Sequence, residues 1–348
     1  MLKAEYKLYK FIFNFPGGTS RGVLTEKTSF FIRVWDSETS DFYGVGEVSL
    51  LPKLSLETPD KVKDILNDFI KNPEDFKNRD LSKYPAVKFG IETAFLDLKN
   101  KGKRIIYPSN FTKSLDSIKI NGLVWMGDKN TMIKRIIEKI ELGFSCIKIK
   151  IGAIDFNDEL YLLKHIRKQF SVKDIEIRVD ANGAFLHSEA LKKIDVLSKY
   201  NIHSIEQPIK QGQWSDMANI CKKTSIPVAL DEELIGVSDI QEREDMLKII
   251  NPQYIILKPS LIGGFSDAKM WSDLAEKQNI GWWVTSALES NIGLNYIAQW
   301  TYINGANMYQ GLGTGKVFTN NITSPLAIKG EQLIYDTNIK WDLKNIFN

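Results

Sequence analysis

Hydrophobic and polar positions follow one pattern before about residue 115 and another after it. Three strand-like runs of alternating or β-rich residues cover 6–15, 29–36 and 42–50. Two runs with helical periodicity cover 58–72 and 84–102. The glycine-rich stretch FPGGTSRG, residues 15–22, is predicted to be a loop between the first two strands. The first part of the chain is therefore predicted to be an α+β unit with antiparallel strands.

Beyond residue 115, short β-rich runs alternate with amphipathic helical stretches. The β-rich runs cover residues 117–125, 145–152, 175–182, 202–208, 226–233, 253–260, 281–290 and 307–313. Helical periodicity is clear at 128–143 and 188–200 and weaker between the fifth and sixth runs. Eight strands at intervals of roughly 25 residues are typical of a (β/α) barrel, whose active site lies at the carboxyl ends of the strands. We predict an α/β protein with two domains. They are a capping domain at 1–112, completed by 323–348, and a barrel at 113–322.

Composition and charge narrow the functional class. The formal net charge of +3 is small and spread along the chain, which argues against nucleic acid or an anionic membrane as partner. The first fifteen residues alternate like a strand and lack the apolar core of a signal peptide, and no run of about 18 apolar residues occurs. Two cysteines, Cys146 and Cys221, suit a reducing compartment. We therefore expect a soluble, cytoplasmic protein, and we leave its oligomeric state open.

Two lysines interrupt the apolar run FSCIKIKIG at 144–152. In a strand, residues i and i+2 point to the same face, so Lys148 and Lys150 share one side of the sheet. Burying an ammonium group costs several kcal/mol unless a counter-charge lies next to it. The run therefore predicts a cluster of acidic groups opposite these two lysines.

Such acidic groups stand at the ends of the next three β-rich runs. Asp180, Glu206 and Asp231 are each about one βα unit apart, and Lys258 ends the run after them. In a barrel these positions face a single mouth. Three carboxylates are the oxygen ligands that Mg²⁺ prefers, and a metal-bound substrate carboxylate would acidify the adjacent C–H. A desolvated lysine beside another cation has a lowered pKa and can act as the base.

Each of these residues also has a purely structural interpretation. A lysine at a strand end commonly reaches solvent, Asp180 could begin a turn, and Asp231 could cap a helix. The shared position at successive strand ends favours a functional site over separate coincidences. The three histidines (His165, His187 and His203) stand outside this register and are interpreted as structural.

The motifs at these strand ends resemble those of the enolase superfamily, in particular its muconate-lactonizing-enzyme subgroup. They read KIK at 148–150, DANG at 180–183, EQP at 206–208, LDEE at 230–233 and LKPS at 257–260. The resemblance implies a modified TIM barrel, (β/α)7β, with an N-terminal α+β capping domain. It also implies Mg²⁺, or alternatively Mn²⁺, at the three carboxylates, with lysine as the catalytic base. A lysine on the sixth strand counts against the mandelate racemase-like subgroup.

Five further segments resemble the o-succinylbenzoate synthase family. They are GGTSRG at 17–22, INGLVWMG at 120–127, KPSLIGGF at 258–265, TSALESNIG at 285–293 and GLGTGKVFTNN at 311–321. The resemblance implies a hydro-lyase of menaquinone biosynthesis that dehydrates 2-succinyl-6-hydroxy-2,4-cyclohexadiene-1-carboxylate to 2-succinylbenzoate. In it, Lys150 removes the proton and returns it to the departing hydroxyl. Lys258 faces the ring from the other side, and Lys148 contacts the carboxylate and holds down the pKa of Lys150.

Substrate contacts are expected from Arg21, Thr285 and Ser286. Arg21 lies in the glycine-rich stretch, which is either a lid over the barrel mouth or an ordinary connector. The expected partner is a small-molecule carboxylate. Two other functions stay open: a racemase of N-succinylamino acids or a dipeptide epimerase, with Lys150 and Lys258 as opposed bases, and a non-catalytic metal-binding barrel.

Overall fold

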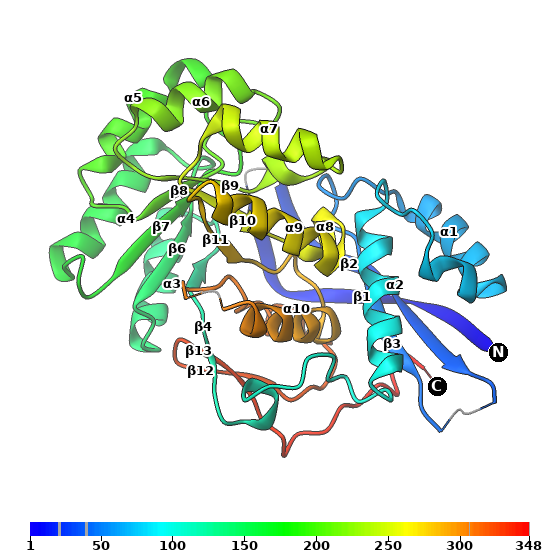
Figure 1. Cartoon of the computed structure of the whole chain (residues 1–348). Helices are drawn as coiled ribbons and strands as arrows, with labels where there is room; N and C mark the ends of the chain where they lie inside the picture. The colour runs from blue at the N-terminus through cyan, green and yellow to red at the C-terminus, as the bar shows by residue number, and fades with distance from the viewer. Residues whose placement is uncertain (20–21, 39–40, 306, 348) are drawn as a thin grey trace.

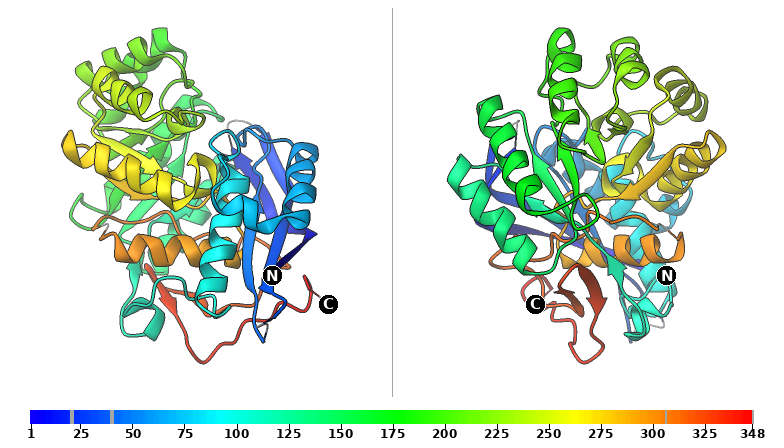
Figure 2. Two further views of the ribbon diagram at one scale, coloured as in Figure 1. Left: turned by 45° about the vertical axis from the view of Figure 1, so that its right-hand side comes forward. Right: turned by 90° about the vertical axis from the view of Figure 1, so that its left-hand side faces the viewer.

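An antiparallel sheet with two helices and a curled parallel sheet ringed by helices make up most of the chain (Figure 1). This computed structural model describes residues 1–19, 22–38, 41–305 and 307–347. The left view in Figure 2 separates the antiparallel part, in blue, from the helices of the parallel part, in green and yellow. We call the first part the cap and the second the barrel.

The cap contains three antiparallel strands in the order β1-β2-β3, as the sequence predicts. Its elements are β1 (Leu2–Thr19), β2 (Gly22–Asp36), β3 (Gly44–Ser49), α1 (Pro59–Lys71), the 3-10 helix η1 (Pro73–Lys77) and α2 (Pro85–Lys99). Phe30 and Ile32 of β2 pack against the cap helices, whereas Phe31 joins the core shared with the barrel. The sheet is therefore buried on both faces, because alternate residues of one strand point to opposite sides.

Strand β3 lies unusually close to helix α2. A Cβ atom added to Gly46 would lie 1.9 Å from the carbonyl oxygen of Gly90, and one added to Gly44 would lie 2.1 Å from that of Ala94. Only glycine permits such an approach of two backbones. The GVGE segment thereby fixes β3 against the helix and determines which way Glu47 points.

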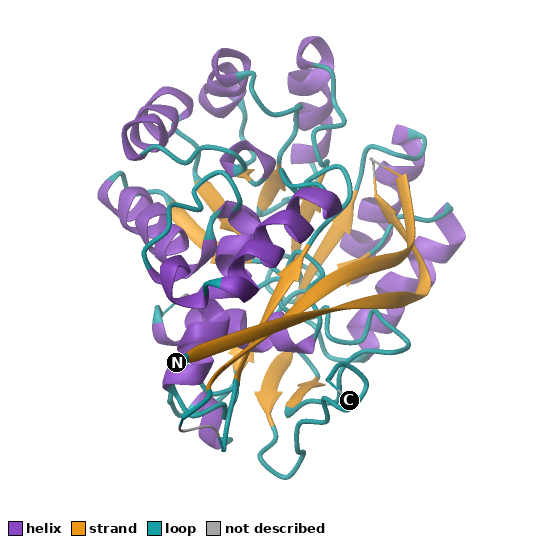
Figure 3. Ribbon diagram, turned by 90° about the vertical axis from the view of Figure 1, so that its right-hand side faces the viewer, coloured by secondary structure: helices purple, strands orange, loops and turns teal. Residues whose placement is uncertain are grey.

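The glycine-rich stretch at 15–22 is not the loop that the sequence predicts. Gly17 and Gly18 belong to β1 and pair with Leu24 and Val23 of β2, and the pairing continues to Thr19 and Gly22. Residues 13–16 form an irregularity in the pairing. There β1 leaves β2 and bonds to the segment 316–320, with the amide of Asn14 donating to the carbonyl of Val317 at 2.9 Å. Figure 3, which faces the cap, shows its long strands crossing in front of the rest of the molecule.

The barrel has the predicted alternation of parallel strands and helices. Seven strands run in the order β11-β10-β9-β8-β7-β6-β5, and all neighbouring pairs are parallel. The strands are β5 (Gly122–Val124), β6 (Cys146–Lys150), β7 (Glu176–Asp180), β8 (Ser204–Glu206), β9 (Val228–Leu230), β10 (Tyr254–Leu257) and β11 (Gly281–Val284). The helices are α3 (Lys129–Glu141), α4 (Phe156–Gln169), α5 (His187–Ser198), α6 (Trp214–Lys223), α7 (Ile240–Ile250), α8 (Pro259–Ile262), α9 (Gly264–Lys277) and α10 (Asn291–Ile303), with the 3-10 helix η3 (Glu232–Leu234). Between the fifth and sixth strands, where periodicity is weak, α7 forms with Asp239 as its cap.

The eighth predicted strand closes the barrel through single bridges. Gln310 pairs with Ile120 and Gly311 with Thr285, both in parallel. The amide of Gly311 donates to the carbonyl of Val284 at 2.7 Å, and the amide of Asn121 donates to that of Gln310 at 3.0 Å. The chain at 307–313 therefore lies between β11 and the segment that precedes β5, which completes a (β/α)7β arrangement.

The C-terminal segment forms a small sheet beside the barrel and then reaches the cap. Strands β12 (Leu326–Lys329) and β13 (Gln332–Tyr335) form an antiparallel pair, and β13 also pairs with β4 (Ile118–Lys119), which follows the 3-10 helix η2 (Phe111–Lys113). The ring of Phe347 lies 6.3 Å from that of Tyr43 in the cap. The last residues of the chain therefore contact the cap. We propose that residues 323–348 complete the capping domain formed by 1–112 and that 113–322 form the barrel domain.

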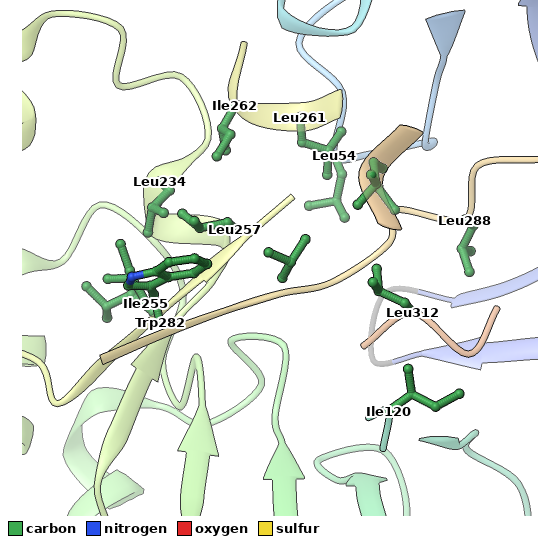
Figure 4. Packing of buried hydrophobic residues seen from close by; sticks show 14 of the residues in the cluster. Leu54, Ile120, Leu234, Ile255, Leu257, Leu261, Ile262, Trp282, Leu288 and Leu312 are labelled. Carbon is green, nitrogen blue, oxygen red and sulfur yellow. The ribbon is translucent and has the colours of Figure 1, made fainter. Parts of the chain in front are cut away.

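One large hydrophobic core joins the cap and the barrel. Leu54, from the segment after β3, belongs to the same buried cluster as Leu257 and Leu261 of the barrel (Figure 4). This core holds the cap over the carboxyl ends of the strands. Within the described ranges, no helix is both long and apolar enough to cross a membrane.

Candidate active site

The charged residues that the sequence predicts to share one mouth do so in the structure. Lys150, Asp180 and Glu206 are the last residues of β6, β7 and β8 and are register partners on neighbouring strands. Asp231 and Lys258 directly follow β9 and β10. We call these five residues and Lys148 the mouth cluster.

Three ammonium groups lie against the carboxylates of the mouth cluster. Lys148 Nζ is 2.9 Å from Asp180 Oδ2 and also forms an ion pair with Glu206. Lys150 Nζ donates to the same Asp180 oxygen at 2.6 Å and to Asn182 Oδ1 at 2.9 Å. Across the sheet, Lys258 forms an ion pair with Asp231. These carboxylates are the counter-charges that the KIK run requires.

Burial makes these contacts strong. Asp180, Glu206 and Asp231 are 0%, 2% and 1% exposed. Burial disfavours the charged form of Asp180, but Lys148 and Lys150 outweigh it and hold the pKa of this carboxyl well below its usual range. Asp231 likewise has a lowered pKa, because Lys258 and Lys148 outweigh burial. Burial, reinforced by the neighbouring Asp180, raises the pKa of Glu206 well above its usual range.

Lys148 and Lys258, the two lysines that are not predicted to be the base, have raised pKa values. Burial lowers the pKa of Lys148, but the three carboxylates outweigh it, and the pKa is raised. Lys258 also has a raised pKa, because Asp231 and its acidic neighbours outweigh burial. Both groups are thus cationic at neutral pH, which suits a role in stabilising negative charge.

A cavity lies between the mouth cluster and the cap. Its inner end is lined by Lys148, Lys150 and Lys258. Its outer wall comes from the β1–β2 hairpin and the segment after β3 and is mainly apolar, through Val23, Leu24, Leu51 and Leu54, with Lys53 as a charged member. A ligand with a charged end and a hydrophobic body would fit this division of the lining.

The predicted substrate contacts fall into three cases. Thr285 lines the cavity, and its buried Oγ1 has no hydrogen-bond partner among the described residues. Ser286 also lines the cavity, but its hydroxyl donates to Glu289 at 2.6 Å and accepts from Thr314 and from the amide of Leu288. Arg21 lies outside the described residues. Of the two hydroxyls, that of Thr285 is the better candidate for a ligand contact, because the Ser286 hydroxyl is already bonded within the protein.

Two asparagines at the site were not predicted from the sequence to be functional residues. Asn182, inside the DANG motif, accepts from Lys150 and donates to Glu232 Oε1 at 3.1 Å. Asn121, inside INGLVWMG, lines the cavity with a buried Oδ1 that lacks a partner within the described part of the chain. Both asparagines lie in motifs on which the family resemblance rests. A motif alone does not show which of its side chains faces the cavity.

The carboxylates of the mouth cluster fit a hard divalent cation. Their donor atoms are all oxygens, which Mg²⁺ prefers. Buried Glu206 Oε1 has no hydrogen-bond partner in the ranges that the structure covers, as expected for an oxygen meant for a ligand. Those ranges contain no three His, Cys, Asp or Glu side chains already arranged around one ion. Here the ammonium groups of Lys148 and Lys258 contact the carboxylates.

Comparison with known proteins decides the family. A family model described as "Enolase C-terminal domain-like" matches residues 131–343. The chain is 44% identical, over 94% of its length and 98% of the relative, to an o-succinylbenzoate synthase of Desulfotalea psychrophila. The chain belongs to the enolase superfamily.

Other members of the superfamily match in sequence or fold. The crystal structure of MenC from Desulfotalea psychrophila is similar with a TM-score of 0.87 and 39% identity, and the match covers 96% of this chain and 99% of that one. An L-Ala-D/L-Glu epimerase of Francisella tularensis subsp. novicida is 31% identical over 63% of this chain and 61% of the relative. A muconate lactonizing enzyme of Pseudomonas fluorescens has a TM-score of 0.82 at 20% identity over 99% of this chain and 97% of that one, which shows a shared fold.

Proposed function

We propose that this protein is an o-succinylbenzoate synthase, a hydro-lyase that acts in menaquinone biosynthesis. The observation that carries the proposal is the 44% identity to such an enzyme over nearly the full length of both chains. The arrangement of the mouth cluster supports it, because the reaction needs a base on one side of the substrate and a cation on the other. The substrate would be 2-succinyl-6-hydroxy-2,4-cyclohexadiene-1-carboxylate.

In this proposal Lys150 is the general base and then the general acid. It removes the proton next to the substrate carboxylate and returns it to the hydroxyl that leaves from the same face, so one side chain serves both steps. Asn182 and Asp180 accept hydrogen bonds from its ammonium group and fix its position. Lys258 directly follows β10, the fourth strand along the sheet from β6, and would face the ring from the opposite side as a permanent cation.

Asp180, Glu206 and Asp231 would hold Mg²⁺, with Mn²⁺ as a substitute. Bound there, the ion would neutralise the substrate carboxylate and make the adjacent C–H more acidic. Lys148 would contribute a second positive charge beside that carboxylate. The Thr285 hydroxyl would donate a hydrogen bond to the part of the substrate that reaches toward the cap.

A racemase or epimerase of the same superfamily is the second candidate, since an L-Ala-D/L-Glu epimerase is 31% identical. It would use Lys150 and Lys258 as bases on opposite faces. Deuterium from D₂O would then appear at the α-carbon of an N-succinylamino acid or a dipeptide. A non-catalytic barrel would need none of the three buried lysines, so it is the weakest alternative.

The decisive assay uses purified protein and the cyclohexadiene substrate, with Mg²⁺ present or removed by EDTA. We expect 2-succinylbenzoate to form with Mg²⁺ and to fall to background with EDTA. Exchange of N-succinylamino acids in D₂O, run in parallel, measures the competing activity. Racemisation faster than dehydration, in kcat/KM, would overturn the proposal.

The cellular setting is part of the same proposal. Cys146 and Cys221 are unlinked and buried, as suits a reducing cytoplasm. The proposed partner is a small carboxylate molecule, without nucleic acid or membrane.

A further inference from the structure

A second buried group of charges lies where the cap meets the barrel, apart from the mouth cluster. Lys27 is only 3% exposed, and Glu47 and Glu289 are fully buried. Lys27 and Glu47 come from β2 and β3, and Glu289 comes from the segment after β11. We call these three residues the junction cluster.

Lys27 directs its ammonium group at the barrel. Its Nζ donates to the carbonyl oxygen of Leu288 at 2.7 Å and also to Ser49 Oγ. Burial lowers the pKa of Lys27, against the opposing effect of Glu47 and Glu289. Lys27 therefore joins the two parts of the molecule, with Ser49 as its acceptor in the cap and Leu288 as its acceptor in the barrel. A lysine is rarely this buried unless its ammonium group has such partners.

The carbonyl that Lys27 holds belongs to a strained residue. Leu288 has φ +62, a left-handed conformation that leucine rarely adopts. Leu288 also lines the cavity, as do Thr285, Ser286 and Ala287 of the same segment. We call residues 285–290 the cavity loop.

The remaining members of the junction cluster fix the two ends of the cavity loop. Glu289 accepts from Ser286 Oγ at 2.6 Å, from the amide of Ala287 at 2.9 Å and from Ser260 Oγ. Glu47 accepts from the amide and hydroxyl of Ser290, where α10 begins. Leu288 lies between these two fixed ends of the cavity loop. Lys27 connects its carbonyl oxygen to the cap.

We propose that Lys27 is a positioning residue: by holding the Leu288 carbonyl it keeps the cavity loop in the left-handed turn that presents Thr285 and Leu288 to the substrate. This inference rests on the proposed function for its kinetic readout. It gives the cap a part in substrate binding beyond supplying an apolar wall. The competing explanation is that Lys27 only neutralises two buried glutamates.

The first test compares Lys27→Met with a matched control, Arg243→Met. Arg243 is also buried, donates to a backbone carbonyl at Val237 and pairs with a buried carboxylate, Asp267, but it lies away from the cavity. We expect Lys27→Met to raise KM about tenfold with kcat changed less than about threefold, because a misplaced binding group weakens substrate positioning. Arg243→Met should lower Tm and leave KM unchanged. Equal KM values in both variants and the wild type would overturn the inference.

A double-mutant cycle separates positioning from charge balance. Glycine adopts the left-handed conformation freely, so in a Leu288→Gly background the turn needs no support. Lys27→Met should then raise KM less than about twofold relative to Leu288→Gly alone. An undiminished KM effect in that background would assign the role of Lys27 to charge balance and overturn the inference.

Two measures keep the test independent of folding defects and of the proposed function. If Lys27→Met does not fold, Lys27→Gln is the second variant: it loses the charge, and its amide nitrogen lies one bond closer to the backbone than the lysine Nζ, so we expect the same KM change. Hydrogen exchange of the peptide 285–294 needs no substrate: exchange should be at least about tenfold faster in the Lys27 variant than in Arg243→Met. Equal exchange would overturn the inference, whereas a wild type without dehydratase activity would overturn only the proposed function.

Discussion

The mouth cluster and the junction cluster are both buried groups of lysines and carboxylates, but their charges are satisfied in different ways. In the mouth cluster, carboxylates contact ammonium groups, and Glu206 keeps one buried oxygen without a partner among the described residues. In the junction cluster, Glu47 and Glu289 accept mainly from hydroxyl groups and backbone amides. Of the two groups, only the mouth cluster contributes charged side chains, its three lysines, to the lining of the cavity.

This difference separates a chemical role from an architectural one. Side-chain ion pairs can rearrange when a cation or a substrate carboxylate arrives, because the incoming charge replaces the partner that each side chain gives up. Amides at a helix N-terminus cannot move without the helix, so a carboxylate bound to them stays fixed. Burial of charge alone therefore does not identify a catalytic group. The kind of partner does.

Replacing the proposed base should give the largest effect. Lys150→Ala should lower kcat for dehydration by more than about 10⁴-fold, since base and acid roles are each typically worth 10²–10⁴-fold. Circular dichroism and Mg²⁺ calorimetry should match the wild type. Lys129→Ala, which removes an exposed lysine paired with Asp158, is the control and should keep full activity. A Lys150→Ala variant with more than about a tenth of wild-type turnover would exclude Lys150 as the base.

The carboxylates of the two clusters should differ in their effect on metal binding. Asp180→Asn, Glu206→Gln and Asp231→Asn should each weaken Mg²⁺ affinity by about 10–100-fold, because a neutral amide replaces an anionic ligand. Glu47→Gln is the matched control, a buried glutamate in the junction cluster, and should leave Mg²⁺ affinity unchanged. Isothermal calorimetry measures all four. Unchanged affinity in the three mouth variants would refute the metal assignment.

The same Glu47→Gln variant should be costly for stability. Glu47 accepts four hydrogen bonds, from Ser29, from the amide and hydroxyl of Ser290 and from the amide of Gly293 at the start of α10. An amide there loses the charge that favours a helix N-terminus and presents a donor to other donors. We expect the free energy of unfolding in urea to fall by about 2 kcal/mol. Glu74→Gln, at an exposed ion pair with Lys77, should change it by less than about 0.5 kcal/mol. Equal losses would mean that Glu47 has no special role.

The smallest expected effect concerns Arg21, which belongs to neither cluster and lies outside the described residues. If the glycine-rich stretch acts as a lid, Arg21→Ala should raise KM about tenfold, because one charge contact with a distal carboxylate is lost. Mg²⁺ affinity should stay at the wild-type value. Wild-type KM and kcat would show that the stretch is a connector and would leave specificity to Thr285 and its neighbours.

The sequence predicts the barrel and the mouth cluster well because both depend on regular spacing. Apolar runs separated by one βα unit bring Asp180, Glu206 and Asp231 to one edge without any knowledge of tertiary contacts. The muconate-lactonizing-type fold and the family follow from the same motifs.

The junction cluster and the hairpin could not be predicted in this way. Lys27 and Leu288 are 261 positions apart, and nothing in the local pattern around EKTS or ALES indicates their contact. The glycines at 17 and 18 suggest a loop, but pairing with β2 overrides that tendency. The pKa of a buried lysine also depends on its full set of neighbours, and the three carboxylates that raise the pKa of Lys148 stand at the ends of other strands.

The contacts of β1 with residues 316–320 have a consequence for synthesis on the ribosome. Ile12 belongs to the first strand to emerge, yet its amide bonds to Asn320, 308 positions later, and its carbonyl accepts from Thr319. The outer edge of this strand therefore stays open for almost the whole of translation. Open edges pair readily with other chains, so nascent chains should depend on chaperones until this last stretch emerges.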